Sequence, residues 1–283
     1  MGHTIIAKDQ NRGRMGRYFS EIWRYRDLLY SLVVRDLKAR YKNSVLGILW
    51  SLFNPLLMML IFTWVFTVML PHQNIRAFPV FFLCGLLPWN YFTGALVSST
   101  ASVVNNAHLI KKVYFPREVL PISAVLSNLV HFLIALIVLF ALMLGFRIPL
   151  SKWLLLLPLV ILIQTIFISG MGLILSTVNV FYRDVQHILE VLLLAWFFLT
   201  PIFYPIDILP RSYQLGGISI DVWRLMRIIN PMASIIATYR DILYWGRMIG
   251  LDFLARTALT ALGFLVIGLI VFHKYSPVFA EEV

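Results

Sequence analysis

The sequence predicts an all-α integral membrane protein with six transmembrane helices, and three observations support this fold class. Of the 283 residues, 60% are hydrophobic and only 13% are charged, whereas soluble domains are about half apolar and a quarter charged. The apolar residues fall into runs that are long enough to cross a hydrocarbon core of about 30 Å. Short segments that contain charged residues or prolines separate these runs.

Residues 1–44 form a basic N-terminal segment that precedes the first apolar run. Ten of the 24 Lys and Arg of the chain lie within residues 1–45. Between residues 18 and 42, apolar side chains recur at helical spacing opposite a basic side, a pattern typical of an amphipathic helix in the membrane interface. The pattern also suits a helix that packs on a partner protein. The apolar side consists of Phe19, Ile22, Trp23, Leu29, Tyr30, Val33, Leu37 and Tyr41.

Six apolar runs are the predicted spans. Pro55 in the first run, and Gly85 and Pro88 in the second, are expected to interrupt helical hydrogen bonding. Small residues at 169–172 predict that a neighbouring helix approaches closely at the middle of the fourth run. The spans are about 45–70, 78–104, 119–144, 153–178, 187–203 and 253–272, and residues 274–283 form a tail.

The segment 206–252, between the fifth and sixth spans, is moderately apolar but contains no run that is long enough to cross a bilayer. We expect re-entrant or interfacial helices here, on one side of the membrane. Such helices require protein or water to satisfy the broken backbone hydrogen bonding. An ordinary extramembrane loop is the alternative, although loops of this length are uncommon unless they are functional.

The distribution of basic residues predicts the orientation of the chain. Six spans place both termini on one side, together with the polar loops 105–118 and 179–186. That side carries fifteen Lys and Arg, against three in the short segments of the opposite side. Because Lys and Arg accumulate on the cytoplasmic side of membrane proteins, both termini and both loops are predicted to be cytoplasmic. The same clustering beside the spans explains the net charge of +11 without nucleic acid as a partner.

The sequence carries no recognisable catalytic, nucleotide or metal site. It has no phosphate-binding loop of the form GxxxxGK[ST], no HExxH zinc motif and no GxSxG nucleophile motif. The thirteen acidic residues are scattered, and Cys84 is the single cysteine. We therefore expect no catalytic residue, no metal ion and no cofactor on this chain.

Two ionisable groups and a set of aromatic residues are candidates for a substrate path. Glu190, near the start of the fifth span, is the first ionisable candidate and His131 in the third span is the second, since charged groups within spans are functional by default. Aromatic faces can stack on sugar rings, but most of these residues equally suit the aromatic belt at the membrane interface. The aromatic candidates are Trp64, Phe66, Phe78, Phe82, Trp89, Phe92, Trp196, Phe197 and Tyr204.

Several motifs together resemble the permease subunits of ABC type-2 exporters for polysaccharides, above all those for O-antigen, capsule and teichoic acid. They begin with RDLKARYKNSVLGILW at 35–50, which leads to Asn54-Pro55. KKVYFPRE at 111–118 and FYRD at 181–184 follow in the two polar loops. Asn230-Pro231 and the YRD sequence at 239–241 lie in the long segment. The resemblance covers about residues 17–275.

The resemblance implies a homodimer in the bacterial inner membrane, bound to two separate cytoplasmic ATPase subunits that carry ATP and Mg²⁺. It also implies an interfacial N-terminal helix, a coupling helix between spans two and three, and gate helices between spans five and six. The expected substrate is a lipid-linked polysaccharide, as in lipopolysaccharide biosynthesis. A permease for drugs or small lipids is the main alternative. A membrane transferase for polyprenyl-linked sugars and an ion-coupled transporter are weaker ones, because the sequence lacks clustered acidic residues and inverted repeats.

Under this resemblance, the polar loops transmit the action of the ATPase to the spans. The basic residues are expected to orient the first loop against acidic groups of the ATPase, while Tyr114 and Phe115 fill its groove. The charges also suit a purely topological role. The predicted coupling residues are Ile110, Lys111, Lys112, Val113, Tyr114, Phe115, Pro116, Arg117, Glu118, Arg183 and Asp184.

Overall fold

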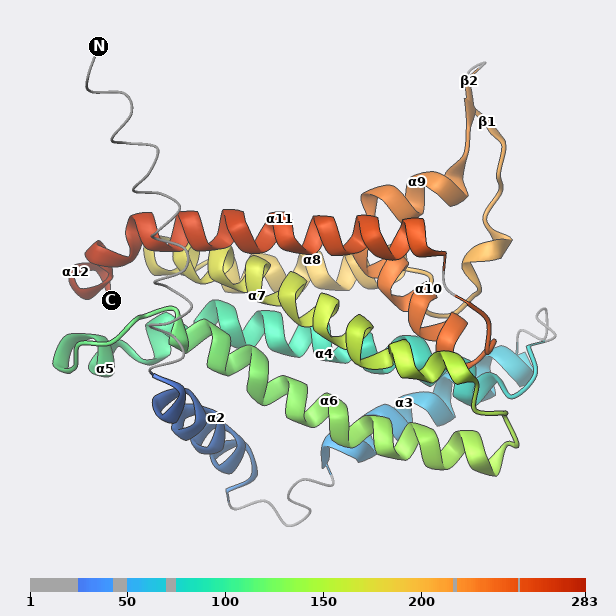
Figure 1. Ribbon diagram of the computed structural model, residues 1–283, viewed down its shortest axis with the longest axis horizontal. Helices are drawn as coiled ribbons and strands as arrows, with labels where there is room; N and C mark the ends of the chain where they lie inside the picture. Colours follow the sequence, from blue (N-terminus) through green and yellow to red (C-terminus); the bar gives the residue numbers. More distant parts are fainter. Residues whose placement is uncertain (1–24, 43–49, 70–74, 216–217, 249) are drawn as a thin grey trace.

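The computed structural model describes residues 25–42, 50–69, 75–215, 218–248 and 250–283. Five helices are long and apolar enough to cross a membrane, and they lie side by side along the longest axis of the molecule (Figure 1). They are α3 (Trp50–Trp64, continued by a π-helical turn at Val65–Met69), α4 (Phe78–Asn105), α6 (Val119–Gly145), α7 (Leu157–Phe181, preceded by a 3₁₀ turn at Lys152–Leu156) and α11 (Leu251–Tyr275).

The predicted fifth span is shorter than the others. It is the helix α8 (Val185–Leu199), whose 15 residues extend about 22 Å at 1.5 Å per residue. Pro201 and Pro205 follow it closely, and a proline lacks the N–H that a continuing helix needs. The structure therefore has five long candidate spans and one short apolar helix among the described residues.

Short elements gather at the two ends of the bundle (Figure 1). One end, called the α5 end, carries α2 (Arg26–Tyr41), α5 (Ala107–Lys112) and α12 (Phe279–Glu282). The other, called the α9 end, carries α9 (Val222–Ile229) and α10 (Pro231–Leu243). Of the predicted helix at 18–42, residues 18–24 lie outside the described residues.

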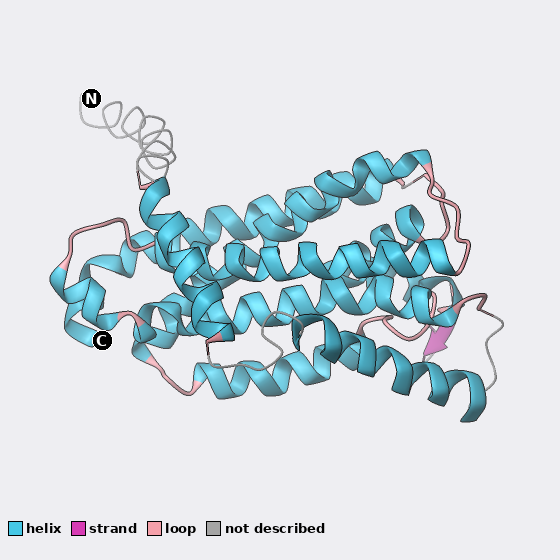
Figure 2. Cartoon of the chain, turned by 90° about the horizontal axis from the view of Figure 1, so that it is seen from below, coloured by secondary structure: helices cyan, strands magenta, loops and turns pink. Residues whose placement is uncertain are grey.

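The α9 end also carries a small antiparallel hairpin, drawn as strands in Figures 1 and 2. Strand β1 (Tyr213–Leu215) pairs with β2 (Ile218–Ile220), and Tyr213 lies opposite Ile220. The chain is mostly helical, as the all-α prediction has it, and this hairpin is a small addition that was not predicted. Three-residue strands are too short to show an alternating pattern of apolar and polar residues.

Helix α4 is the centre of the bundle. In its most apolar 18-residue stretch, 78% of the residues are buried within the chain, against 11–44% in the corresponding stretches of the other long helices. It packs against α3, α6, α7 and α10, and it continues through Pro88, where an interruption was expected. The Gln164 side chain donates a hydrogen bond to the Pro88 carbonyl at 2.8 Å and accepts one from the Tyr239 hydroxyl. These bonds tie α4, α7 and α10 together inside the core.

Helices α7 and α11 form the most extensive contact between described elements, and glycines allow it. A Cβ atom at Gly170 would overlap the backbone of Phe264 and Leu265, and one at Gly268 would overlap the Gly170 carbonyl. Small residues let the two backbones touch, as is common in membrane helix pairs. The close approach that the sequence predicted at 169–172 is confirmed: the neighbour is α11 at Gly170 and Ser99 of α4 at Gly172.

Candidate functional site

The first predicted loop lies at the α5 end, and its side chains divide into exposed and buried groups. Lys111, Lys112 and Val113 are exposed, and Tyr114 is 96% exposed. Phe115, by contrast, is only 7% exposed. Neighbouring residues of an extended chain point to opposite sides, so the loop presents Tyr114 outward and anchors itself through Phe115. Of these two aromatic residues, Phe115 therefore packs within this chain, and Tyr114 is available to a partner.

A separate hydrophobic cluster, here called the α5-end cluster, anchors this loop. It joins the loop to α2, α7, α11 and α12, although these elements are far apart in sequence. Its buried members are Leu32, Val103, Ile110, Phe115, Val119, Leu120, Leu173, Val180, Phe272 and Phe279. Ile110, Pro116 and Glu118 are buried or half-buried beside the exposed residues of the same loop.

The C-terminal segment contacts both predicted loops. Arg117 donates a hydrogen bond to the Ser276 carbonyl, and the Glu118 carboxylate lies 3.8 Å from the His273 ring nitrogen. In the second loop, the ring of Phe181 lies 6.5 Å from that of Phe279. Arg183 and Asp184, the predicted coupling residues of that loop, are exposed. The structure thus brings both loops together through a segment that the sequence analysis treated as a tail.

Replacing Phe279 with alanine tests this anchoring. Phe279 is fully buried, and truncating a buried phenylalanine costs about 3–5 kcal/mol. We expect faster hydrogen exchange at the backbone amides of α5 and α12 in the full-length protein. Val278→Ala is the matched control because Val278 is 38% exposed. Equal exchange in the two variants would show that Phe279 does not hold the loop.

The predicted substrate-path residues occupy two different environments. Phe78, Phe82, Trp89 and Phe92 are buried in the core of this chain. The rings of the first two contact α3, the π-helical turn that continues it and the segment after α8, and those of the last two contact α7 and α8. Phe82, for example, lies 5.7 Å from Phe203 between ring centroids. These four residues line no exposed surface of the chain. Phe66, Trp196, Phe197 and Tyr204 are half-buried, while Trp64 and Glu190 are exposed.

The Asn230-Pro231 pair fixes the start of α10. The Asn230 Oδ1 atom accepts hydrogen bonds from the Ala233 backbone N–H and from Trp196 Nε1. Its Nδ2 donates to the Thr200 hydroxyl at 2.9 Å. Asparagine is favoured at this capping position, and proline is favoured in the first turn that follows. The motif therefore locks α10 to the end of α8.

Arg240, in the middle of the YRD motif, holds the turn that follows α8. Its side chain is 3% exposed, and it donates hydrogen bonds to the carbonyls of Pro201 (2.6 Å), Tyr204 (3.0 Å) and Ile202. Its guanidinium carbon lies 3.8 Å from the centroid of the Phe81 ring. A Cβ atom at Gly85 would lie 2.8 Å from Arg240 Nη2, so the glycine makes room for this guanidinium.

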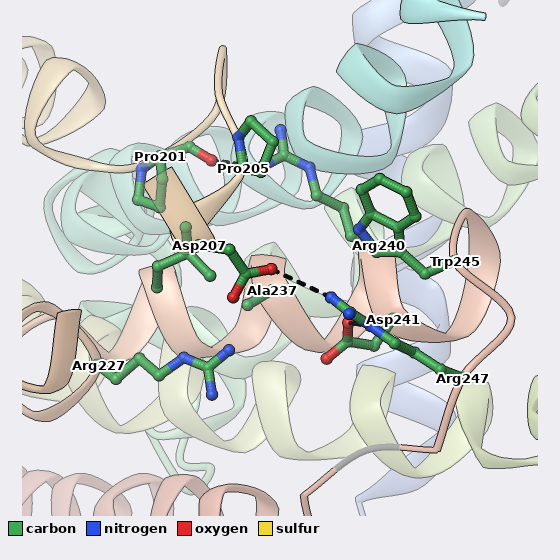
Figure 3. Close-up of a pocket in the computed structure, with 10 residues that line it drawn as sticks. Pro201, Pro205, Asp207, Arg227, Ala237, Arg240, Asp241, Trp245 and Arg247 are labelled. Atoms are coloured by element: carbon green, nitrogen blue, oxygen red, sulfur yellow. Dashed lines mark hydrogen bonds and ion pairs between the residues drawn. The ribbon is translucent and has the colours of Figure 1, made fainter. Parts of the chain in front are cut away.

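Charged residues line an open pocket at the α9 end, with about 290 Å³ of empty volume that includes open solvent (Figure 3). Arg247 pairs with both acidic residues, at 3.2 Å from Asp207 and 2.8 Å from Asp241. Burial raises the pKa of Asp241, and the hydrogen bond from Arg247 opposes this rise. Arg227 and Arg240 also line the pocket. The sequence analysis singled out Arg240 and Asp241 only as parts of a motif, because their partners come from other segments.

Comparison of the sequence with those of known proteins identifies its family. The profile of the ABC-2 type transporter family matches residues 27–244. The chain is 37% identical over 273 residues to the O-antigen export system permease protein RfbA of Myxococcus xanthus, covering 95% of this chain and all of the relative. It is 36% identical over 257 residues to the Klebsiella pneumoniae protein of the same name, covering 90% and 94%.

A more distant relative is the polysialic acid transport protein KpsM of Escherichia coli. It is 26% identical over 240 residues, which cover 82% of this chain and 88% of the relative. The family match includes both predicted loops, the Asn230-Pro231 cap and Arg240. The chain therefore belongs to the ABC-2 type transporter family.

Proposed function

We propose that this chain is the permease subunit of an ATP-driven exporter that moves lipid-linked polysaccharide across the bacterial inner membrane. The observation that carries the proposal is the identity of 36–37%, over nearly the whole chain, to proteins named O-antigen export system permeases. The more distant similarity to a polysialic acid transport protein supports polysaccharide as the substrate class rather than one particular polymer.

In this proposal the α5 end faces the cytoplasm and the α9 end faces outward, with both termini in the cytoplasm. The excess of Lys and Arg in the N-terminal segment and the two loops supports this orientation. Helix α8, extended by residues 200–205, makes the sixth crossing. Helices α9 and α10 are the re-entrant elements between the last two spans.

ATP and Mg²⁺ are assigned to two separate cytoplasmic ATPase subunits. The full sequence contains no phosphate-binding loop, and the described residues contain no group of three His, Cys, Asp or Glu side chains that could hold a metal ion. The exposed Lys111, Lys112 and Tyr114 form the surface that the ATPase contacts. A second copy of this chain completes the pathway. Exposed apolar residues on α3 and α8, such as Trp64 and Phe198, supply surface that lipid or that copy covers.

Helix α11 is the element that links the two ends in this mechanism. At the α5 end, Ser276 and His273 contact the first loop. At the α9 end, the Thr257 and Ser234 hydroxyls are 2.8 Å apart, joining α11 to α10. Arg256 Nη2 also donates to the Arg227 carbonyl of α9. Displacement of the loop by the ATPase therefore moves α11, and with it the outer helices. The displacement requires different loop contacts in the two states.

Tyr114→Ala tests the coupling surface. Removing an exposed aromatic anchor from an interface costs about 2 kcal/mol or more, so export per ATP hydrolysed should fall by about tenfold or more. The measurement is polymer export and ATP hydrolysis by the complex in liposomes. Tyr213→Ala, an exposed tyrosine at the α9 end, is the control and should leave both rates unchanged. Normal coupling in Tyr114→Ala would contradict the assignment.

The substrate class has its own test. The chain is co-purified with its ATPase and reconstituted, and ATP hydrolysis is measured with lipid-linked oligosaccharide or with amphipathic drugs. Stimulation by the oligosaccharide alone supports polysaccharide export. Stimulation by drugs alone would replace the proposal with the alternative of a drug or small-lipid permease.

A further inference from the structure

Arg227 lies on α9 at the α9 end, against the rings of Trp223 and Phe253, which contact each other edge to face. Its guanidinium carbon is 4.2 Å from the centroid of the Trp223 ring and 4.4 Å from that of Phe253, at the start of α11. Two further arginines contact the same rings. The guanidinium carbon of Arg211 lies 5.3 Å from the centroid of the Trp223 ring, and that of Arg256 lies 5.0 Å from the centroid of the Phe253 ring. Contact with the rings restricts the position of a guanidinium but uses none of its N–H donors.

The donors of Arg227 have no acceptor among the residues that the structure describes. Its Nε is buried without a hydrogen-bond partner, and no carboxylate of the described chain lies within ion-pair distance of it. The nearby carboxylates of Asp207 and Asp241 are already bound to Arg247 (Figure 3). A half-buried cation with unused donors is costly, because buried polar groups are almost always paired. Because the side chain is only half-buried, its other N–H donors remain available to an external acceptor.

The charge around Arg227 favours an anion as that acceptor. The lining of the pocket contributes three arginines, namely Arg227, Arg240 and Arg247, against two aspartates. Arg211 and Arg256 add two more positive charges beside the rings. Guanidinium groups bind phosphate oxygens through two parallel hydrogen bonds.

The exposed residues of α9 favour a lipid as the source of this anion. Leu225, Ile228 and Ile229 are exposed, and their spacing of three and four residues places them on one face of the helix, opposite Arg227. An apolar face on a short helix suits the membrane interface, where the phosphates of lipid head groups are the nearest anions.

We propose that Arg227, held by Trp223 and Phe253, binds the phosphate head group of a lipid at the α9 end. The source is either the diphosphate of the exported lipid carrier or the phosphodiester of a membrane phospholipid. Naming the carrier rests on the proposed function, whereas the binding of a lipid phosphate does not.

The test measures binding by the purified full-length chain in detergent, using isothermal titration calorimetry. The probes are farnesyl diphosphate, dihexanoyl-phosphatidylglycerol and inorganic pyrophosphate. Arg227→Gln should raise the Kd of the bound lipid probe by about tenfold, since a hydrogen bond to a charged group contributes about 1.5–3 kcal/mol. Arg224→Gln removes the same charge from an exposed position of the same helix and should leave the Kd unchanged. Arg227→Lys, which keeps the charge, should recover part of the affinity.

The outcomes separate the sources. Arg227-dependent binding of farnesyl diphosphate alone assigns the site to the lipid carrier, and binding of phosphatidylglycerol alone assigns it to membrane phospholipid. Equal weakening by Arg224→Gln and Arg227→Gln, or pyrophosphate binding as tight as that of farnesyl diphosphate, would overturn the proposal. The melting temperature of each variant shows whether it is folded. Since the assay uses neither ATP nor polymer, its failure would leave the polymer-stimulated ATP hydrolysis of the proposed exporter intact.

Discussion

Replacing Gly268 with alanine is expected to separate α7 from α11 and to lower the stability of the protein by about 3 kcal/mol. The added methyl group would overlap the Gly170 carbonyl oxygen. Overpacking a core costs about 1–3 kcal/mol, and the upper value applies here because the group in the way is backbone and cannot rotate aside. The helices must then move apart along the most extensive contact of the described structure.

Gly263 provides the matched control on the same helix. A Cβ atom there would have no neighbour within 4 Å. Gly263→Ala should therefore be neutral, or stabilising by up to about 1 kcal/mol through higher helix propensity. Thermal unfolding in detergent, followed by size-exclusion chromatography, measures both variants. If Gly268→Ala unfolds at the same temperature as Gly263→Ala, the close contact between α7 and α11 is not present in the protein.

Arg240→Met is expected to release the turn after α8 and, with it, the outer helices. Methionine fills similar volume but leaves the carbonyls of Pro201, Ile202 and Tyr204 without donors. Each orphaned buried acceptor costs about 1–3 kcal/mol. Removal of a buried charge returns part of this, so we expect a net loss of about 2–4 kcal/mol. Proteolysis between residues 200 and 250 should become faster in the full-length protein.

Two further variants separate the role of Arg240 from a general effect of charge. Arg247→Met removes an exposed arginine at the same end and should speed proteolysis less than Arg240→Met does. Its ion pair with the exposed Asp207 contributes only about 0–1 kcal/mol, and its other partner, Asp241, is only half-buried. Gly85→Ala approaches the same contact from α4, since its Cβ would lie 2.8 Å from Arg240 Nη2. This variant should also speed proteolysis between residues 200 and 250, but less than Arg240→Met does. Faster proteolysis in Arg247→Met than in Arg240→Met would refute the proposed role of Arg240.

The long spans could be predicted from the sequence because their length and apolarity follow from bilayer thickness alone. The second predicted span, 78–104, matches α4 at Phe78–Asn105 almost residue for residue. The burial of Phe78, Phe82, Trp89 and Phe92 could not be predicted in the same way. In a membrane helix the faces towards protein and towards lipid are both apolar, so periodicity does not distinguish them.

The residues that carry the candidate site depended on tertiary partners that no local pattern reveals. Phe115 and Tyr114 look equivalent in sequence, but only Phe115 meets the α5-end cluster. Phe279 lies in a short, charged tail. It is buried because the chain after α11 folds back and brings its ring against those of Phe272 and Phe181. Proline after α8 was a visible signal for a helix end. The guanidinium that holds that turn comes from a position about 40 residues later.

The attachment of α11 at both of its ends has a thermodynamic consequence for the proposed exporter. Coupling between two binding sites is reciprocal, so each ligand changes the affinity of the other by the same factor. If ATP binding on one side biases the position of α11, then a polymer stalled among the outer helices must alter the affinity for ATP to the same extent. A nucleotide Kd that does not change when export is arrested would show that α11 carries no such coupling. A change would mean that the exporter senses a blocked exit through this helix, without a separate sensor.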